Sequence, residues 1–504
     1  MQAQRPTAKY ASLAAPVGGW NARDAVANMA PLDAVKMDNV WPTTSDVMLR
    51  KGYIEWATGL GSAVETLMAY QSTTGEKLFG ISASGVYDVT SQGAVGAAVV
   101  SGLTNARFQY VNVSNAGGSY LIAVNGEDAP LLYDGTTWSN TAITGFTQSR
   151  AIQINLFKNR VWLIEKDTLK AWYLGVDAIS GAASALNFQS VATRGGYLMA
   201  MATWTIDAGE GVDDYAAFIT SEGEVIVYQG TDPTTAATWA LKGVWQLGSP
   251  IGRRCFIKFG GDLLLICLDG VQPMSKTLQS SRVSPKQAIT DKIQGAMSEA
   301  ASLYSANFGW QLDFCPNNSR IMLNVPVGNN VQEQFAMNTI TGSWARFTGI
   351  AANCWEQYDN VSFFGGAGTV YKFWEGYNDD GASIVGDVLQ AFNTFGSPGN
   401  MKRWTMAQLF LNATGSPSVA ASINVDYDIT LLPVSINFAP IVFGVWGTGL
   451  WDTAIWGGTL STYRPYVGLT GLGKAAAMRL AMESSELEIH WQATNFVYET
   501  GGFL

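Results

Sequence analysis

Residues 77–82, KLFGIS, and residues 85–90, GVYDVT, form two short apolar runs separated by a small turn. Each run has the length and the Val, Ile, Phe and Tyr content of a strand, so the pair predicts an antiparallel β-hairpin. Similar pairs recur at 108–113 with 119–124, 160–165 with 169–173, 215–220 with 224–228, 262–267 with 270–274, and 361–364 with 369–374. The sequence therefore predicts an all-β fold.

A second pattern recurs within these units: a strand ends in a polar turn and a tryptophan follows shortly afterwards. It occurs at residues 133–138, 228–239 and 337–344. Weak repetition of meander units of about 40 to 50 residues is typical of a β-propeller, for which we expect about five to seven blades. One or two β-sandwiches with aromatic cores are the alternative.

The length and spacing of the expected strands divide the chain into three parts. We expect residues 61–379 to form the propeller-like domain, and residues 380–504 to form an appended β platform that residues 1–60 complete. Strands after residue 380 are expected at 406–412, 421–427 and 487–498. In the last of these, Ile489 and Trp491 alternate with Glu488 and His490, which predicts a half-buried strand with His490 facing outward.

One or two short helices are expected to interrupt this pattern. Residues 284–303 begin with a Ser-Pro pair suited to a helix start, and apolar residues then follow near helical spacing. Residues 31–38 predict a shorter helix that ends before Pro42.

Composition points to a protein that buries surface against partners. Charged residues make up 14% of the 504 residues and apolar ones 47%, against about 25% charged residues in a typical soluble protein. The net charge of −10 argues against gripping nucleic acid through its phosphates, although an acidic wall would let DNA slide past. Ordinary solubility charge explains the same number.

Residues for common catalytic chemistry are scarce. His490 is the only histidine, which makes a histidine-based triad or a two-histidine metal site improbable. Cys255, Cys267, Cys315 and Cys354 show no metal or redox spacing and are expected to be buried thiols in a reducing compartment. The first residues show no signal peptide, and we expect no membrane span.

Four acidic groupings and one glycine-rich stretch contain residue types that occur in functional sites. Adjacent or near carboxylates occur at Asp213 with Asp214, Asp379 with Asp380, Glu486 with Glu488, and Asp426 with Asp428. Such pairs are common in turns, so neither a sugar-cleaving centre nor a calcium site is assigned. Residues 468–474, GLTGLGK, lack the hydroxyl residue that completes a phosphate-binding loop and are expected to be a strand followed by a glycine turn.

A glycine-rich stretch with three tryptophans lies at residues 444–458, GVWGTGLWDTAIWGG. It is expected to be either a self-packed aromatic loop or an exposed loop that inserts into a partner.

Three groups of short segments, near the start, in the middle and at the end of the chain, resemble those of one protein family. They are GGWN at 18–21, MAPLDA at 29–34, NVWP at 39–42 and RKGY at 50–53; GYNDDGASI at 376–384 and VLQAFNTFGSPGNMK at 388–402; and YETGG at 498–502. Together they resemble the tail nozzle, or hub, proteins of short-tailed bacteriophages.

The resemblance implies a structural protein of the virion tail, assembled in the host cytoplasm, and not an enzyme. Nozzle proteins of this kind form a homohexamer that continues the DNA channel below the portal and adaptor rings. They contact other tail proteins, such as fibres or spikes, and retain the packaged DNA until ejection. DNA passes without sequence-specific binding, and no catalytic, cofactor or metal residue is implied.

Two other functions remain open. One is a receptor-binding or polysaccharide-cleaving tail protein, which should show two convergent carboxylates in an aromatic cleft. The other is a non-viral propeller scaffold, which should be stable as a monomer.

Overall fold

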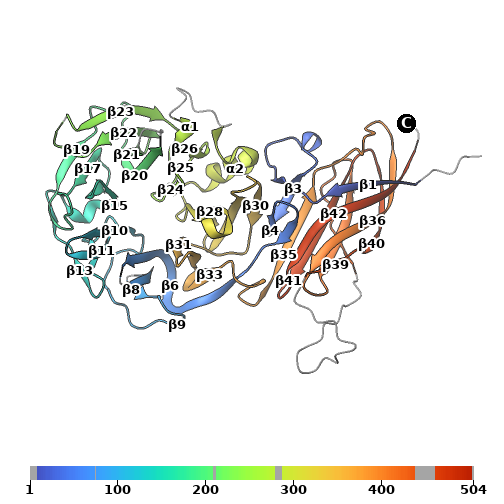
Figure 1. The fold of residues 1–504 in the computed structure, drawn as a ribbon, viewed down its shortest axis with the longest axis horizontal. Helices are drawn as coiled ribbons and strands as arrows, with labels where there is room; N and C mark the ends of the chain where they lie inside the picture. Colours follow the sequence, from blue (N-terminus) through green and yellow to red (C-terminus); the bar gives the residue numbers. More distant parts are fainter. Residues whose placement is uncertain are drawn as a thin grey trace, which may run out of the picture.

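The computed structural model describes residues 8–73, 75–83, 85–207, 212–235, 237–277, 287–436 and 460–501. Within these ranges nearly every regular element is a β-strand. Figure 1 shows a ring of small sheets built from the middle of the chain, with a β-rich platform beside it that contains both the first and the last strands. The predicted class is confirmed: an all-β fold with a propeller-like domain and an appended platform.

The ring is a propeller with seven blades in the described part of the chain. In chain order the blades are β6–β8, β10–β13, β15–β17 with β19, β20–β23, β24–β26, β27–β30, and β31–β33 with β6 again. Neighbouring blades contact one another in a closed circle. The bounds are β6 Tyr53–Ser72, β7 Gly75–Ser82, β8 Gly85–Asp88, β10 Gln109–Asn115, β11 Gly118–Val124, β12 Leu131–Tyr133, β13 Trp138–Asn140, β15 Ala151–Phe157, β16 Arg160–Glu165, β17 Lys170–Tyr173, β19 Ser184–Asn187, β20 Leu198–Asp207, β21 Val212–Thr220, β22 Glu224–Gly230, β23 Trp239–Gln246, β24 Phe256–Phe259, β25 Asp262–Cys267, β26 Gly270–Pro273, β27 Gln311–Cys315, β28 Arg320–Gly328, β29 Val331–Asn338, β30 Trp344–Phe347, β31 Cys354–Tyr358, β32 Val361–Gly365 and β33 Ala367–Phe373. Short pairings outside the blades join β9 Gly93–Ala94 to β6, and β14 Ile143–Thr144 to β18 Gly181–Ala182.

Strand β6 closes the ring because it serves two blades. Its first half pairs with β33 of the last blade, and its second half pairs with β7 of the first blade. The chain passes from one blade to the other at Gly59 and Gly61, whose φ angles of 90° and 81° are strained for residues with a side chain. Backbone hydrogen bonds of one continuous strand therefore hold the two ends of the ring together.

The tryptophans that follow polar turns mark the outermost strands of blades. Trp138, Trp239 and Trp344 begin β13, β23 and β30. Each lies opposite a residue at the end of the preceding strand, namely Tyr133, Gly230 and Met337. The pattern seen in the sequence is the hairpin between the third and fourth strands of a blade.

The platform is a sandwich of two sheets that enclose one apolar core. One sheet contains β4, β5, β42 and β36, with β1 beside β42 and with β39 and β40 beside β36; the other contains β2, β3, β35, β41, β37 and β38. The bounds are β1 Ala8–Ala14, β2 Gly19–Trp20, β3 Asp33–Asp38, β4 Val40–Pro42, β5 Val47–Leu49, β34 Asn378–Asp379, β35 Ala382–Gln390, β36 Lys402–Ala413, β37 Ser418–Val425, β38 Val434–Ile436, β39 Ser461–Tyr463, β40 Tyr466–Gly473, β41 Ala476–Ser484 and β42 Ile489–Thr500. Residues 8–49 thus contribute strands to the platform, whereas the ring strand β6 already begins at Tyr53, before the boundary expected at residue 61.

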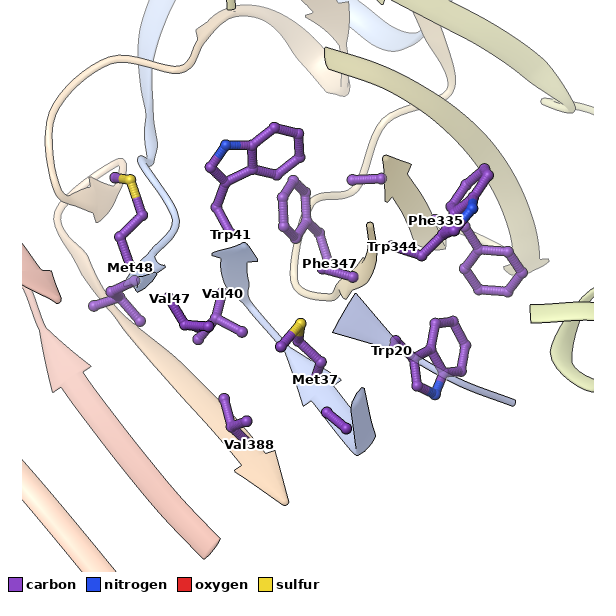
Figure 2. Close-up of a cluster of buried hydrophobic side chains, with 14 of the residues drawn as sticks. Trp20, Met37, Val40, Trp41, Val47, Met48, Phe335, Trp344, Phe347 and Val388 are labelled. Atoms are coloured by element: carbon purple, nitrogen blue, oxygen red, sulfur yellow. The ribbon is translucent and has the colours of Figure 1, made fainter. Parts of the chain in front are cut away.

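Propeller and platform share their largest core (Figure 2). The ring centroid of Trp41, on β4, lies 6.2 Å from that of Phe347, on β30, and 5.5 Å from that of Trp374, which follows β33. On the other side of Met37, Trp20 meets the edge of Phe335 at 5.4 Å. Because aromatic side chains from both parts interleave, the contact between them resembles a domain core more than a mobile hinge.

The expected helix at residues 31–38 is wrong, because Asp33–Asp38 form strand β3. Met37 lies opposite Val388 of β35 and is fully buried. Pairing with a distant strand has overridden the local helical pattern.

The second expected helix is shorter than the sequence suggested. Helix α2 runs over Gln294–Tyr304 after a single 3-10 turn at Asp291–Ile293, and residues 284–286 lie outside the described ranges. Ile289 and Thr290 cannot be helical because they bind strand β26, where the backbone N–H of Ile289 and the hydroxyl of Thr290 pair with the backbone of Val271. A further four-residue helix, α1, covers Met274–Thr277.

Candidate functional site

Arg50 lies where the platform meets the propeller and is 1% exposed. Its guanidinium donates hydrogen bonds of 2.7 and 2.5 Å to the two carboxylate oxygens of Asp379. It also donates to the side-chain oxygen of Asn39 at 3.0 Å and to the carbonyl of Thr348 at 3.2 Å. This fork-shaped, charge-assisted pair fixes the segment before β6 against the segment after β33.

The same two segments touch through their backbones. A Cβ on Gly52 would lie 1.6 Å from the carbonyl oxygen of Asn378. The N–H of Gly52 donates to the carbonyl of Gly376 at 3.1 Å, and the N–H of Asp380 donates to the carbonyl of Tyr53 at 2.9 Å. Only glycine permits this approach, so RKGY at 50–53 and GYNDD at 376–380 form a single structural unit, called the junction here.

A second meeting point lies within the platform. The ring centroid of Phe395 is 5.5 Å from that of Tyr498, and the N–H of Gly501 donates to the carbonyl of Met401 at 2.9 Å. Lys402 is fully buried, and its ammonium donates to the carbonyls of Ser397 and Lys474 at 2.7 and 2.8 Å. Segments that are distant in the sequence therefore pair in space: residues 50–53 with 376–380, and residues 395–402 with 498–501.

One side chain, that of Arg254, reaches across the inside of the propeller. Arg254 precedes β24 of the fifth blade, yet it donates to Thr66 Oγ1 at 2.6 Å and to the carbonyl of Phe108 at 3.2 Å, on the first and second blades. It also reaches Gln311 of the sixth blade at 3.4 Å. The axial cavity beside it holds only about 230 Å³.

Glu356 is the most perturbed carboxyl group of this axial cavity. Burial raises its pKa to about 7, despite the opposing hydrogen bond from Tyr110. Asp313, also on the cavity wall, accepts hydrogen bonds from Ser362 at 2.8 Å and from Gln357 at 2.6 Å. Two carboxyl groups share the cavity, but a space of about 230 Å³ is too small for a sugar chain.

Exposed apolar side chains gather at one edge of the platform, which we call the apolar edge. Strand β38 ends one sheet, β40 lies at the border of the other, and β37 and β40 contact each other. The apolar edge comprises Tyr427, Ile429, Leu431, Leu432, Val434, Tyr466 and Leu472. Val434 is 71% exposed and Leu432 66% exposed, and exposed apolar side chains concentrated on neighbouring strands are typical of an interaction surface.

The expected outward position of His490 is wrong, since the residue is 9% exposed. Strand β5 lies beside it, with Met48 opposite His490. Its Nδ1 lies 3.0 Å from Asp46 and its Nε2 lies 2.9 Å from Glu488, which also accepts a hydrogen bond from the hydroxyl of Tyr377. Both ring nitrogens face carboxylates, so this histidine is a structural ion-pair partner.

The pH dependence of this cluster has a definite sign. Burial alone would lower the pKa of His490, but the hydrogen bonds to Asp46 and Glu488 outweigh it and raise the pKa above 6.5. The stabilisation is fully present below pH 6.5, where the unfolded histidine is also protonated, and is lost as the pH rises through the higher folded-state pKa. For Asp46 and Glu488, burial is likewise outweighed and the pKa is lowered, so their contributions are lost only in acid.

We expect NMR of the only histidine ring to give a folded-state pKa above 6.5, and urea unfolding to show stability falling above that pH. His490→Gln should abolish this part of the pH dependence. A folded-state pKa at or below 6.5 would contradict the ion-pair assignment.

Several carboxylates of the acidic pairs named in the sequence have structural partners. Asp379 binds Arg50, and Asp380 occupies a turn with a φ of 50°. Asp214 accepts hydrogen bonds from Lys158 and Thr205, whereas the side chain of Asp213 lies outside the described residues. Asp428 accepts hydrogen bonds from Thr430, and Asp426 accepts them from the backbone N–H groups of Lys474 and Ala475. Among the described residues no three His, Cys, Asp or Glu side chains are grouped as for a metal ion.

The glycine-rich stretch, the cysteines and the tryptophan-rich stretch lie as follows. Residues 468–473 lie in strand β40, as predicted, but Lys474 and Ala475, not a glycine, form the turn to β41. All four cysteines are buried and unpaired, as predicted. The tryptophan-rich stretch at 444–458 lies outside the described residues. No helix within the described ranges has the length and apolar character needed to cross a membrane.

Comparisons with known proteins add little beyond this geometry. No family model matches the chain, and no curated protein matches it. It is similar to the crystal structure of the computationally designed Ika8 protein, with 13% identity over 63% of this chain and 99% of that chain and a TM-score of 0.36. It is also similar to BBS1N in complex with ARL6DN. The mercury-soaked crystal gives 8% identity, 64% and 97% coverage and a TM-score of 0.40, and the lead-soaked crystal gives the same identity and coverage with 0.39. The fold assignment therefore rests on the strand pairings themselves.

Proposed function

We propose that this protein is a structural subunit of the tail nozzle of a short-tailed bacteriophage. Its copies would form a homohexameric ring that docks below the portal and adaptor rings, retains packaged DNA and passes it during ejection. The observation that carries the proposal is the pairing of the signature segments, RKGY with GYNDD at the junction and GSPGNMK with YETGG in the platform. In such a family these distant segments would be retained for one physical reason: each completes the packing of another.

The reach of Arg254 across the inside of the propeller restricts where DNA would pass. A duplex whose major groove alone is about 12 Å wide is too large for a cavity of about 230 Å³. The conduit of the proposed nozzle would therefore lie between subunits, with the propellers as its walls or outer lobes. The net charge of −10 suits a wall that repels phosphate.

The apolar edge is the surface that we assign to contacts between copies. Closing a ring through a heterologous interface buries a patch on each subunit, and the apolar edge is suited to such burial because its residues surround the free borders of two sheets.

The first test is the mass and symmetry of the purified protein, alone and with portal and adaptor proteins, by light scattering and electron microscopy. A closed sixfold ring, alone or only on the adaptor, supports the nozzle. A monomer that ignores both partners contradicts it and would direct attention to receptor or sugar binding.

Substitutions in the apolar edge should weaken the assembly. We expect Leu432→Glu combined with Val434→Glu to raise the concentration needed for ring formation at least about tenfold, because buried charges at an interface cost more than about 1.4 kcal/mol. Ile340→Glu is the matched control, since Ile340 is 70% exposed on a propeller turn away from that edge. Unchanged assembly in the double variant, or equal loss in the control, would exclude the apolar edge as the contact.

A further inference from the structure

A second, larger pocket lies at one end of the propeller axis, above Arg254. It holds about 580 Å³ and is lined by loops that lead into the inner strands of several blades. It shares Arg254 and Gln109 with the axial cavity, so the crossing arginine forms its floor. We call it the mouth pocket; its volume lies within the range of about 300–1,000 Å³ that is typical of ligand sites.

The charges around the mouth pocket do not balance. Arg107 pairs with Glu65 at 3.0 Å, and Glu127 pairs with Lys166 at 2.6 Å. Arg254 donates its hydrogen bonds to neutral oxygens only. These are the backbone carbonyls of Glu65 and Phe108 and the side-chain oxygens of Thr66 and Gln311. The lining of the pocket thus holds three arginines, Arg107, Arg253 and Arg254, and two carboxylates, Glu65 and Glu127.

Arg253 is the group left without a partner. It is half-buried on the pocket wall, and among the described residues it makes no hydrogen bond and no ion pair. Its Nη1 lies 3.4 Å from the position that a Cβ on Gly126 would occupy, which places the guanidinium over that turn. Burial lowers the pKa of Arg253, and the charges of Asp167 and Glu127 oppose this shift.

The remaining lining suits a peptide-sized ligand. Phe308 is stacked by Arg107 at 4.2 Å and by Arg254 at 5.3 Å, so two guanidiniums are held in place around one ring. Asn105, Asn307 and Gln109 add amide groups to the wall. A planar guanidinium fork matches a carboxylate with two parallel hydrogen bonds.

We propose that the mouth pocket binds a carboxylate side chain of an acidic peptide segment from a partner protein, with Arg253 as the residue that pairs with the carboxylate. This site is independent of the proposed tail function, because it depends only on the propeller. Binding of an acidic peptide would not be explained by the overall charge of the protein. The net charge is −10, which repels such a peptide.

The test uses the full chain and an end-blocked triglutamate peptide, with triglutamine as the neutral match and inorganic phosphate as a second oxyanion. Calorimetry at neutral pH should show that triglutamate binds and triglutamine does not. Arg253→Gln should weaken triglutamate binding by about tenfold or more, the equivalent of one charge-assisted hydrogen-bonded pair. Arg403→Gln, the same change on an exposed platform residue, should leave binding unchanged.

A second variant separates loss of charge from loss of folding. Ala306 is exposed at the rim of the pocket, so Ala306→Phe should fill the space and block the peptide while the protein stays folded. The proposal is overturned if triglutamate binds no better than triglutamine, if phosphate alone binds, if both pocket variants bind normally, or if Arg403→Gln weakens binding equally.

Discussion

Replacing Arg50 with methionine should lower the free energy of unfolding by about 3–5 kcal/mol, because it leaves Asp379 without its cation in a nearly closed site. The side chain of Arg50 is 1% exposed and that of Asp379 is 11% exposed. The substitution also removes the hydrogen bonds that Arg50 donates to Asn39 and Thr348. Urea unfolding followed by circular dichroism measures the loss.

Arg23→Met provides the exposed counterpart of this experiment. Arg23 forms ion pairs with Asp24 and Asp291, but its side chain is 45% exposed, so the loss should be about 0–1 kcal/mol. Adding Asp379→Leu to Arg50→Met should recover part of the stability, because removing both charges avoids a buried unpaired carboxylate. A loss below about 1 kcal/mol in Arg50→Met alone would show that the junction does not depend on this pair.

Local sequence patterns predicted the propeller strands because a hairpin is encoded within a few residues. The runs at 77–82 and 85–90 correspond to β7 and β8, the two strands of one hairpin. The tryptophans that follow polar turns begin the outer strands of three blades. Blade number was harder to predict, since β24–β26 has three strands and β6 is shared between two blades.

The errors arose where distant segments decide the structure. Residues 33–38 are a strand because β35 lies beside them, and His490 is buried because β5 covers it. Neither neighbour is visible in a local window, so periodicity alone gave a helix in one case and an outward side chain in the other.

The junction shows the same limit for the candidate site. Arg50 and Asp379 are 329 residues apart, and nothing in their local sequence patterns pairs them. Arg253 gave no signal at all, because an arginine becomes informative only when its surroundings leave it unpartnered. The low fraction of charged residues indicated that the protein buries surface against partners. It did not indicate where the apolar edge lies.

Trp41→Ala should cost about 3–5 kcal/mol, as expected for removing a buried tryptophan that the surrounding core cannot replace. Trp41 is 5% exposed and touches Phe347 and Trp374 of the propeller from its place on β4. Because one core spans both parts, we expect the unaltered protein to unfold in a single calorimetric transition and Trp41→Ala to unfold in two. Hydrogen exchange should then show β42 of the platform opening separately from β15 of the propeller.

Trp245→Ala is the control for this prediction, since Trp245 is half-buried on the outer strand β23, far along the chain from the junction. It should destabilise the protein less and leave a single transition. If Trp41→Ala also unfolds in one transition, the two parts are coupled mainly by the Arg50–Asp379 pair and by the backbone contacts of Gly52. The double variant with Arg50→Met should then be the one that separates them, because it removes the aromatic and the ionic contact together.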